Sequence, residues 1–127
     1  MMDNKAYTIL LFCLVIVALA SGIAFGGAPM VRVGDMTAHG TGLSPGPGSP
    51  NVFVCGDPAW RATSDIHSCP LVDPLQRPHG SGVVPFGSVT VFVNGYPAVY
   101  QGCFVQEIPF GGPNTITLGC PTVLCGP

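Results

Sequence analysis

The feature that most constrains this chain is an internal repeat. The segment GSPNVFVCGDPA at 48–59 reappears without a gap as GSVTVFVNGYPA at 87–98. A third, truncated copy, GCPTVLCGP, occupies 119–127. Each copy reads as a turn, a short run of β-branched and aromatic residues, and a second turn at a glycine. The repeat therefore predicts three similar strand-turn units.

Units this short cannot each bury an apolar face alone, so we expect them to share one interior. Stacking about a pseudo-threefold axis would provide it. The predicted strands lie at 52–54, 91–93 and 123–124, and the glycines that would permit a hairpin turn with positive φ are Gly56, Gly95 and Gly126. Beyond the first 25 residues no segment reads as an amphipathic helix, and prolines interrupt most windows. The predicted fold class is all-β.

The chain begins with a hydrophobic segment. Residues 6–25 are uncharged and apolar, which is about the length that crosses a bilayer as a helix. We therefore divide the chain into a transmembrane-like segment at 1–27 and a β domain at 28–127. Two alternatives stay open, a signal peptide cut after Ala20 and a helix packed within an assembly. The apolar run continues beyond Ala20, and Asp3 offsets Lys5 before it, which favours a retained helix.

Composition argues against two functional classes. Only 8% of the residues are charged and the net charge is −2, so the chain lacks the basic surface of a nucleic-acid-binding protein. No Ser-His-Asp spacing, phosphate-binding glycine loop or HExxH motif occurs. We expect Asp35 and Asp65 to orient their loops by hydrogen bonds rather than to form a catalytic pair. The sequence predicts a protein that is not an enzyme.

Cysteine and histidine side chains between the units predict a metal site. The chain has six cysteines and three histidines, and leaving out Cys13 in the apolar segment gives an odd number of cysteines, which disulfides alone cannot pair. If the units share an axis, their connecting loops meet at one end. Three imidazoles and one thiolate could then fill a tetrahedral zinc shell. The predicted ligands are His39, His67, His79 and Cys103, with Cys69 as the alternative sulfur.

The remaining cysteines, Cys55, Cys120 and Cys125, lie in or beside the predicted strands. We expect them to be small buried hydrophobic side chains.

Several short motifs resemble one known family. PAWR at 58–61 is similar to the Pro-Ala-Ala-Arg motif that names the PAAR-repeat proteins, and DIHSCP at 65–70 and PHG at 78–80 are similar to that family as well. RVGDMTAH at 32–39 resembles the element that precedes PAAR domains in members with N-terminal hydrophobic segments. The resemblance covers 30–127. Trp60 departs from the motif, and so does Tyr100, which stands where the second copy would have arginine.

The resemblance implies a cone-shaped β domain that caps the trimeric β-helical spike of a contractile injection machine, either a type VI secretion system or a phage-tail-like particle. The spike protein would be of the valine-glycine-repeat type or a phage spike. The tip would sharpen the spike for membrane puncture and effector delivery, and it would leave the cell with the particle. A chaperone could shield the hydrophobic segment, and the target membrane would be a further partner.

Family members bind zinc near the vertex through three histidines and one cysteine, which implies His39, His67, His79 and Cys103 here. A closed four-ligand shell would make this Zn²⁺ structural. The alternative function is a secreted or membrane-anchored, disulfide-linked β domain with a binding role.

Overall fold

A computed structural model describes residues 26–127, so the hydrophobic segment predicted at 6–25 lies outside the described residues. Within them the chain forms eleven short strands and no helix, which confirms the all-β fold class. No helix of the described part has the length and apolar character needed to cross a membrane.

The strands form four antiparallel sheets. One has five strands in the order β10-β9-β6-β5-β2, and the other three are the pairs β1-β11, β3-β4 and β7-β8. The strand bounds are β1 Ala28–Met30, β2 Pro45–Gly46, β3 Phe53–Val54, β4 Asp57–Pro58, β5 Ile66–Val72, β6 Pro78–Gly82, β7 Phe92–Val93, β8 Tyr96–Pro97, β9 Phe104–Pro109, β10 Gly112–Thr115 and β11 Cys120–Cys125.

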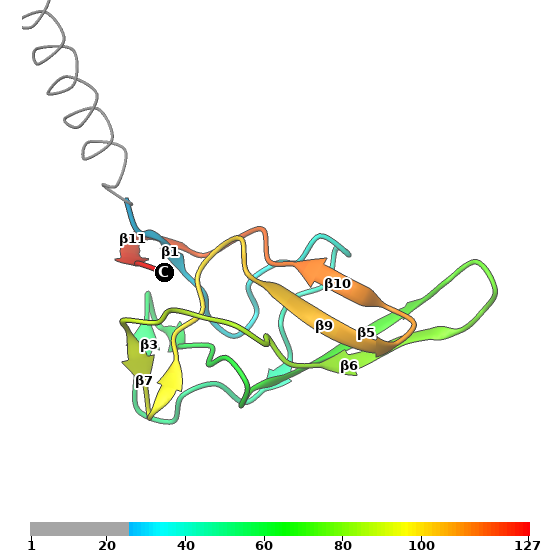
Figure 1. Ribbon diagram of the computed structural model, residues 1–127, viewed down its shortest axis with the longest axis horizontal. Helices are drawn as coiled ribbons and strands as arrows, with labels where there is room; N and C mark the ends of the chain where they lie inside the picture. The colour runs from blue at the N-terminus through cyan, green and yellow to red at the C-terminus, as the bar shows by residue number, and fades with distance from the viewer. Residues whose placement is uncertain (1–25) are drawn as a thin grey trace, which may run out of the picture.

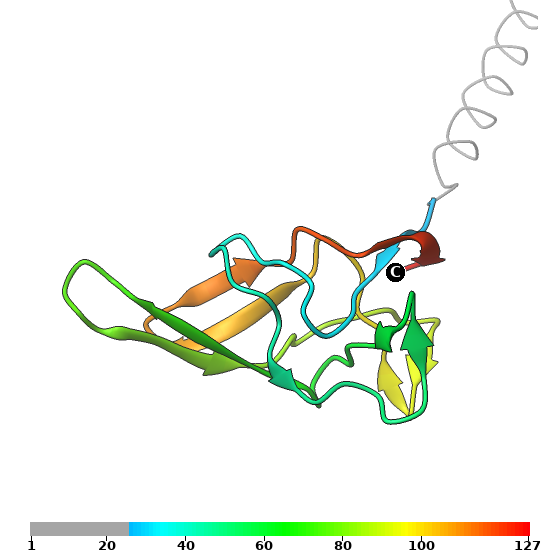
Figure 2. The ribbon, with the colours of Figure 1, turned by 180° about the vertical axis from the view of Figure 1, so that it is seen from behind.

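The two kinds of sheet occupy opposite ends of the molecule (Figure 1). The three strand pairs gather at one end, which we call the broad end. The five-stranded sheet extends away from them, and the molecule narrows toward the loop that joins β5 to β6 (Figure 2). We call the β5–β6 and β9–β10 hairpins the narrow end.

The first two copies of the repeat fold as the sequence predicts. β3 and β4 form one hairpin, and β7 and β8 form another. The turn residues have positive φ in both: 50° at Cys55 and 88° at Gly56, then 53° at Asn94 and 82° at Gly95. Two successive positive φ angles are the signature of the two-residue turns that match strand twist. The turn glycines expected at 56 and 95 are confirmed.

The third copy finds its partner at the other end of the described chain. β11 contains the strand predicted at 123–124, but it pairs with β1, Ala28 opposite Cys125 and Met30 opposite Cys120. The turn expected at Gly126 is therefore wrong, because no hairpin follows this strand. The physical reason is that the second strand of the third unit is β1, which precedes the first copy of the repeat in the sequence.

Each strand pair adjoins a matching four-residue segment: PMVR at 29–32, PAWR at 58–61 and PAVY at 97–100. These segments bond to one another in a closed cycle. The amide after each segment donates to the proline carbonyl of another, at distances of 2.9 Å for Val33 to Pro58, 2.9 Å for Ala62 to Pro97 and 2.8 Å for Gln101 to Pro29. Isolated bridges join Arg32 to Ala59, Arg61 to Ala98 and Met30 to Tyr100 in the same cycle.

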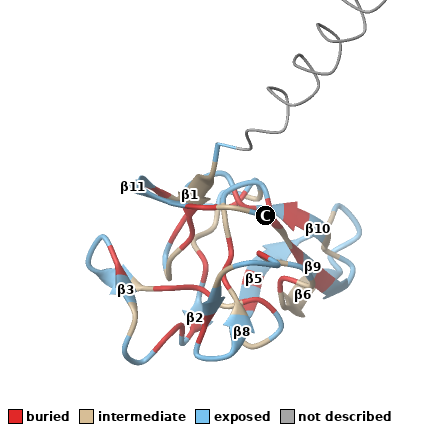
Figure 3. Ribbon diagram, turned by 60° about the vertical axis from the view of Figure 1, so that its left-hand side comes forward, coloured by how far each residue is buried: buried red, intermediate tan, exposed pale blue. Residues whose placement is uncertain are grey.

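The buried side chains form two clusters, and the backbone of the buried residues is red in Figure 3. The cluster beneath the strand pairs contains Met30, Val54, Ala59, Val93, Ala98, Cys120 and Cys125. The second holds one fully buried residue from each four-residue segment, and its members are Val31, Leu43, Trp60, Ala62, Val84, Val99, Cys103, Val105 and Ile116. Burial of such side chains stabilises the fold by about 1.5 to 3 kcal/mol for each large one.

A disulfide links Cys55, in the first hairpin turn, to Cys120 at the start of β11, with their α-carbons 6.3 Å apart. The expectation of a small buried side chain is wrong for Cys55, which is exposed, whereas Cys120 is buried as expected but is joined in the disulfide. Which cysteines pair cannot be read from spacing, because it depends on which segments lie side by side. Cys69, Cys103 and Cys125 are free and buried.

Candidate metal centre

Four side chains from four separate segments meet in the half of the molecule built on the five-stranded sheet. His39 lies in the loop between β1 and β2, Cys69 on β5, His79 on β6 and Glu107 on β9. One potential ligand atom of each lies within 4.8 Å of all the others, so the group could hold a metal ion.

The sheet brings these strands together because glycine stands where they approach closely. Gly80 follows His79, has φ of +92° and pairs with Cys69 on one side and Pro109 on the other. A Cβ atom at this position would lie 1.7 Å from the carbonyl oxygen of Ile108. Only glycine lets β6 pass this close to β9. The histidine and the glutamate are thereby placed on neighbouring strands.

The separations within the group lie close to those of a four-ligand shell. His39 Nδ1 lies 3.2 Å from His79 Nδ1, and Cys69 Sγ lies 3.9 and 3.5 Å from these two nitrogens. Glu107 Oε2 lies 3.0 Å from His39 Nδ1 and 3.5 Å from His79 Nδ1. In a tetrahedral zinc site with bonds of about 2.0 to 2.3 Å, ligand atoms lie about 3.3 to 3.7 Å apart. The donor set and its spacing therefore fit such an ion.

A second set of polar groups fixes the orientation of these ligands. Glu107 is fully buried, and its Oε1 accepts a hydrogen bond of 2.6 Å from Asn114 Nδ2. Asn114 Nδ2 also donates to Thr37 Oγ1, and Asn114 Oδ1 accepts from the amide of His39 at 3.0 Å. One buried amide thus ties together two segments that carry ligands. Such outer contacts hold metal ligands in place and tune their basicity.

His67, one of the predicted ligands, lies beside the group rather than within it. Its ring is fully buried, and Nε2 lies 3.4 Å from Glu107 Oε1, the oxygen that faces away from the other histidines. The amide of Ser44 donates to His67 Nδ1 at 3.4 Å. Burial lowers the pKa of His67, which favours the neutral ring. A neutral ring that accepts at Nδ1 carries its proton on Nε2, where it faces Glu107.

The two candidate sulfurs lie in different surroundings. Cys69 belongs to the group, whereas Cys103 packs in the second core cluster, its carbonyl accepting from the amide of Ile116 at 2.8 Å. Burial raises the pKa of both thiols. The structure thus brings together two of the predicted histidines and the alternative sulfur, and it places Cys103 in the apolar interior.

Glu107 is the member of the group that sequence reasoning missed. The signal lay in strand periodicity. Along 103–107 burial alternates, so that Cys103, Val105 and Glu107 face inward while Gln106 is exposed. A carboxylate on the inward face of an otherwise apolar strand needs a partner, since a buried unpaired charge is very costly. Glu107 is also the chain's only glutamate.

The two aspartates orient their loops as expected. Asp65 is fully buried and accepts hydrogen bonds from the amide of Arg61 at 2.7 Å and from its guanidinium at 2.9 and 3.1 Å. Asp35 binds Arg32 in the same way, at 2.7, 2.8 and 3.1 Å. Each pair closes the turn after its four-residue segment, so the prediction of a structural role is confirmed.

Comparison with protein-family models finds no match to this chain, and comparison with curated proteins finds none either. The chemistry open to the site follows from its own residues. Two imidazoles, one thiol and one carboxylate are donors of the type that zinc accepts in proteins.

Proposed function

We propose that this chain is a metal-stabilised tip of the PAAR class. Its broad end would cap the trimeric spike of a contractile injection machine, and its narrow end would lead. One observation carries the proposal. Three matching segments bond in a closed cycle at one end, and a group able to hold a metal ion lies in the half that narrows to the other end. In this proposal the three strand pairs repeat around a pseudo-threefold axis in a cone-like shape.

The surface of the broad end supports a threefold partner. The outward residues at matching positions of the three strand pairs have nearly equal exposure: 60% at Phe53, 58% at Phe92 and 58% at Leu124. The residues that follow each of them are buried. A trimer presents the same surface three times about its axis, so three matching apolar side chains fit it better than a single patch would. The edges of two-stranded pairs can also extend a partner's sheet.

The metal in this proposal is a structural zinc held by His39, Cys69, His79 and Glu107. Four protein ligands leave no open position for water or substrate, so we assign the ion no catalytic role and the chain no enzymatic activity. His67 is the nearest imidazole outside the group, with its Nε2 3.4 Å from Glu107 Oε1. In the three-histidine arrangement implied by the PAAR resemblance, it would replace the carboxylate.

Metal analysis of the purified full-length chain in detergent tests the site. We expect about one zinc per chain, as in a closed structural site. Substitution of His39, Cys69 or His79 by alanine should abolish binding, and Cys103→Ala is the matched control that should retain it. Zinc loss in the Cys103 variant with retention in the Cys69 variant would contradict the proposed shell.

A capping assay tests the partner. The chain is mixed with a trimeric β-helical spike protein, and the complex is detected by size-exclusion chromatography. Phe53→Asp combined with Phe92→Asp should abolish the complex, while Leu75→Asp at the opposite end should leave it intact. Equal behaviour of the two variants would argue against docking through the broad end.

The disulfide favours a second candidate function. Disulfides persist in oxidising compartments, and the bond between Cys55 and Cys120 suits a secreted or membrane-anchored β domain with a binding role. This alternative expects a fold that is stable without metal. The tip proposal expects the metal-free chain to lose much of its stability. Thermal melting with and without a chelator separates them.

A further inference from the structure

The loop between β5 and β6 forms the extremity of the narrow end (Figures 1 and 2). Its backbone N–H donors bond within the loop. The amide of Asp73 donates to the carbonyl of Arg77 and that of Gln76 to the carbonyl of Asp73, each at 2.9 Å. Asp73 Oδ1 accepts from the amides of Leu75 at 2.9 Å and Arg77 at 3.0 Å. Pro74 has no N–H. Every amide donor from 73 to 77 is therefore satisfied within the loop.

The two charges of the loop are also paired with each other. Arg77 Nε and Nη2 each lie 2.7 Å from Asp73 Oδ2. The guanidinium carbon of Arg77 lies 4.3 Å from the centre of the Phe110 ring. The loop thus carries no net charge and no unpaired ionic group.

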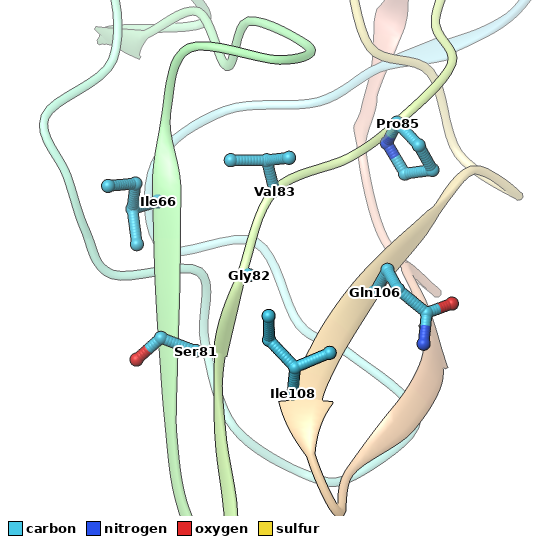
Figure 4. A pocket seen from close by; sticks show the side chains of 7 residues that line it. All are labelled: Ile66, Ser81, Gly82, Val83, Pro85, Gln106 and Ile108. Atoms are coloured by element: carbon cyan, nitrogen blue, oxygen red, sulfur yellow. The ribbon is translucent and has the colours of Figure 1, made fainter.

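The loop exposes Leu75 beside the polar side chains of Gln76 and Arg77. Leu75 is 71% exposed, the largest fraction among the apolar side chains of this end. Further exposed apolar residues lie on the adjoining strands and the β9–β10 turn: Ile66, Leu71, Val72, Ile108 and Phe110. Ile66 and Ile108 also line a pocket on this sheet, and they lie on either side of Gly82 in β6 (Figure 4). Such concentrations of exposed apolar surface mark interaction sites.

We propose that the β5–β6 loop inserts Leu75 into the interfacial region of a lipid bilayer. Polypeptide that enters lipid must satisfy its own backbone hydrogen bonds, since the hydrocarbon offers no partners. This loop meets that requirement for every backbone N–H donor, pairs its two charges with each other and places leucine at its apex. A partner strand would instead need unpaired amides to bond with, and the loop has none left. The observations thus favour lipid over a protein partner.

The lipid needs no negative charge. Only four residues of the chain are lysine or arginine, and Arg77, the one in this loop, is paired with Asp73. Attraction to anionic headgroups requires a cluster of basic residues. Zwitterionic phosphatidylcholine should therefore be sufficient. This inference rests on the proposed function for its direction, because a leading narrow end is what would bring the loop to a membrane.

The test places tryptophan in the loop of the full-length chain. Leu75→Trp is compared with Phe86→Trp, a control at a side chain that is 77% exposed but lies outside the loop and its adjoining strands. Both are mixed with phosphatidylcholine vesicles whose acyl chains are brominated. Emission from the native Trp60, which is fully buried, is recorded in the unmodified chain and subtracted.

We expect the Leu75→Trp emission to shift to the blue and to be quenched by bromine, and the Phe86→Trp emission to do neither. Quenching that is equal at both positions, absent at 75 or dependent on anionic lipid would overturn the inference. The predicted apolar segment at 6–25 could itself bind vesicles. For this reason the experiment measures the surroundings of the labelled residue and not the overall binding of the chain. Zinc content and spike capping of the same Leu75→Trp chain are measured in parallel. They test the proposed function separately.

Discussion

At the scale of single residues, the most consequential side chain is Glu107. A fully buried carboxylate is tolerated only where cations or donors surround it, and here three histidine nitrogens and the Asn114 amide lie within 3.5 Å of its two oxygens. The same arrangement suits a metal ion between the histidines and the carboxylate. The residue thus connects the stability of the sheet to the occupancy of the site.

Replacing this carboxylate tests its part in metal binding. Glu107→Gln preserves the shape of the side chain and removes its charge. Zinc affinity should therefore fall at least about tenfold, because the loss of a contact that only supports a metal ligand already costs about that much. Competition with a chromophoric chelator measures the affinity. Gln106→Ala, an exposed neighbour, is the control. Unchanged affinity in the Glu107 variant would indicate that His67 supplies the fourth ligand.

Asp65 provides a second test at this scale. Asp65→Asn leaves the Arg61 guanidinium beside a neutral group in a largely buried turn, which typically costs about 3 to 5 kcal/mol. Asp57→Asn removes an exposed carboxylate that lies 3.8 Å from Arg32, and it should cost at most about 1 kcal/mol. Chemical denaturation gives both values. Similar losses would show that the buried pair adds no more than a surface one.

At the scale of elements, the disulfide joins the first hairpin to the strand that completes the third unit. Cys55 and Cys120 are separated by 65 residues, so the bond closes a long loop of chain. A cross-link of this kind restricts the unfolded chain more than a short one does.

Removal of the cross-link should therefore destabilise the domain. The double substitution Cys55→Ser and Cys120→Ser should lower the free energy of unfolding by about 2 to 4 kcal/mol. Adding a reductant to the unmodified chain should produce a similar loss and leave the double variant unaffected. If the reductant lowers the stability of both chains equally, another thiol is responsible.

The strand pairs also show what sequence can predict. The two hairpins could be predicted because each is local, with its glycine turn inside the repeated string. The pairing of β1 with β11 could not, since nothing near Cys120 or Met30 reveals a partner at the far end of the described chain. The disulfide was missed for the same reason. His39 and His79 stood out by residue type, whereas Glu107 required the inward face of β9 to be identified.

At the scale of the whole molecule, the domain has two small apolar clusters and depends on added constraints. Domains of this size often need a disulfide or a metal to supplement the core. This chain has a disulfide between its strand pairs and a candidate metal group on the five-stranded sheet. Each constraint serves a different part of the fold.

Metal removal should therefore lower the stability of the entire domain. An ion that binds only the folded state adds about 2.7 kcal/mol when its concentration is 100 times the Kd. A chelator should lower the Tm of the unmodified chain and leave that of Cys69→Ser unchanged. Scanning calorimetry makes the measurement. Melting that is insensitive to the chelator in both chains would count against a structural ion.

The pairing of β1 with β11 has a consequence for biosynthesis. Ala28, Pro29 and Met30 emerge from the ribosome early but can find their partners only after residues 120–125 have been made. Until then the β1-β11 strand pair cannot form, and the apolar side that the first two hairpins share remains uncovered. The domain can therefore be completed only after residues 120–125 have left the ribosome, and contacts so distant along the chain make this step slow. Quality-control factors would encounter the nascent protein in this unfinished state.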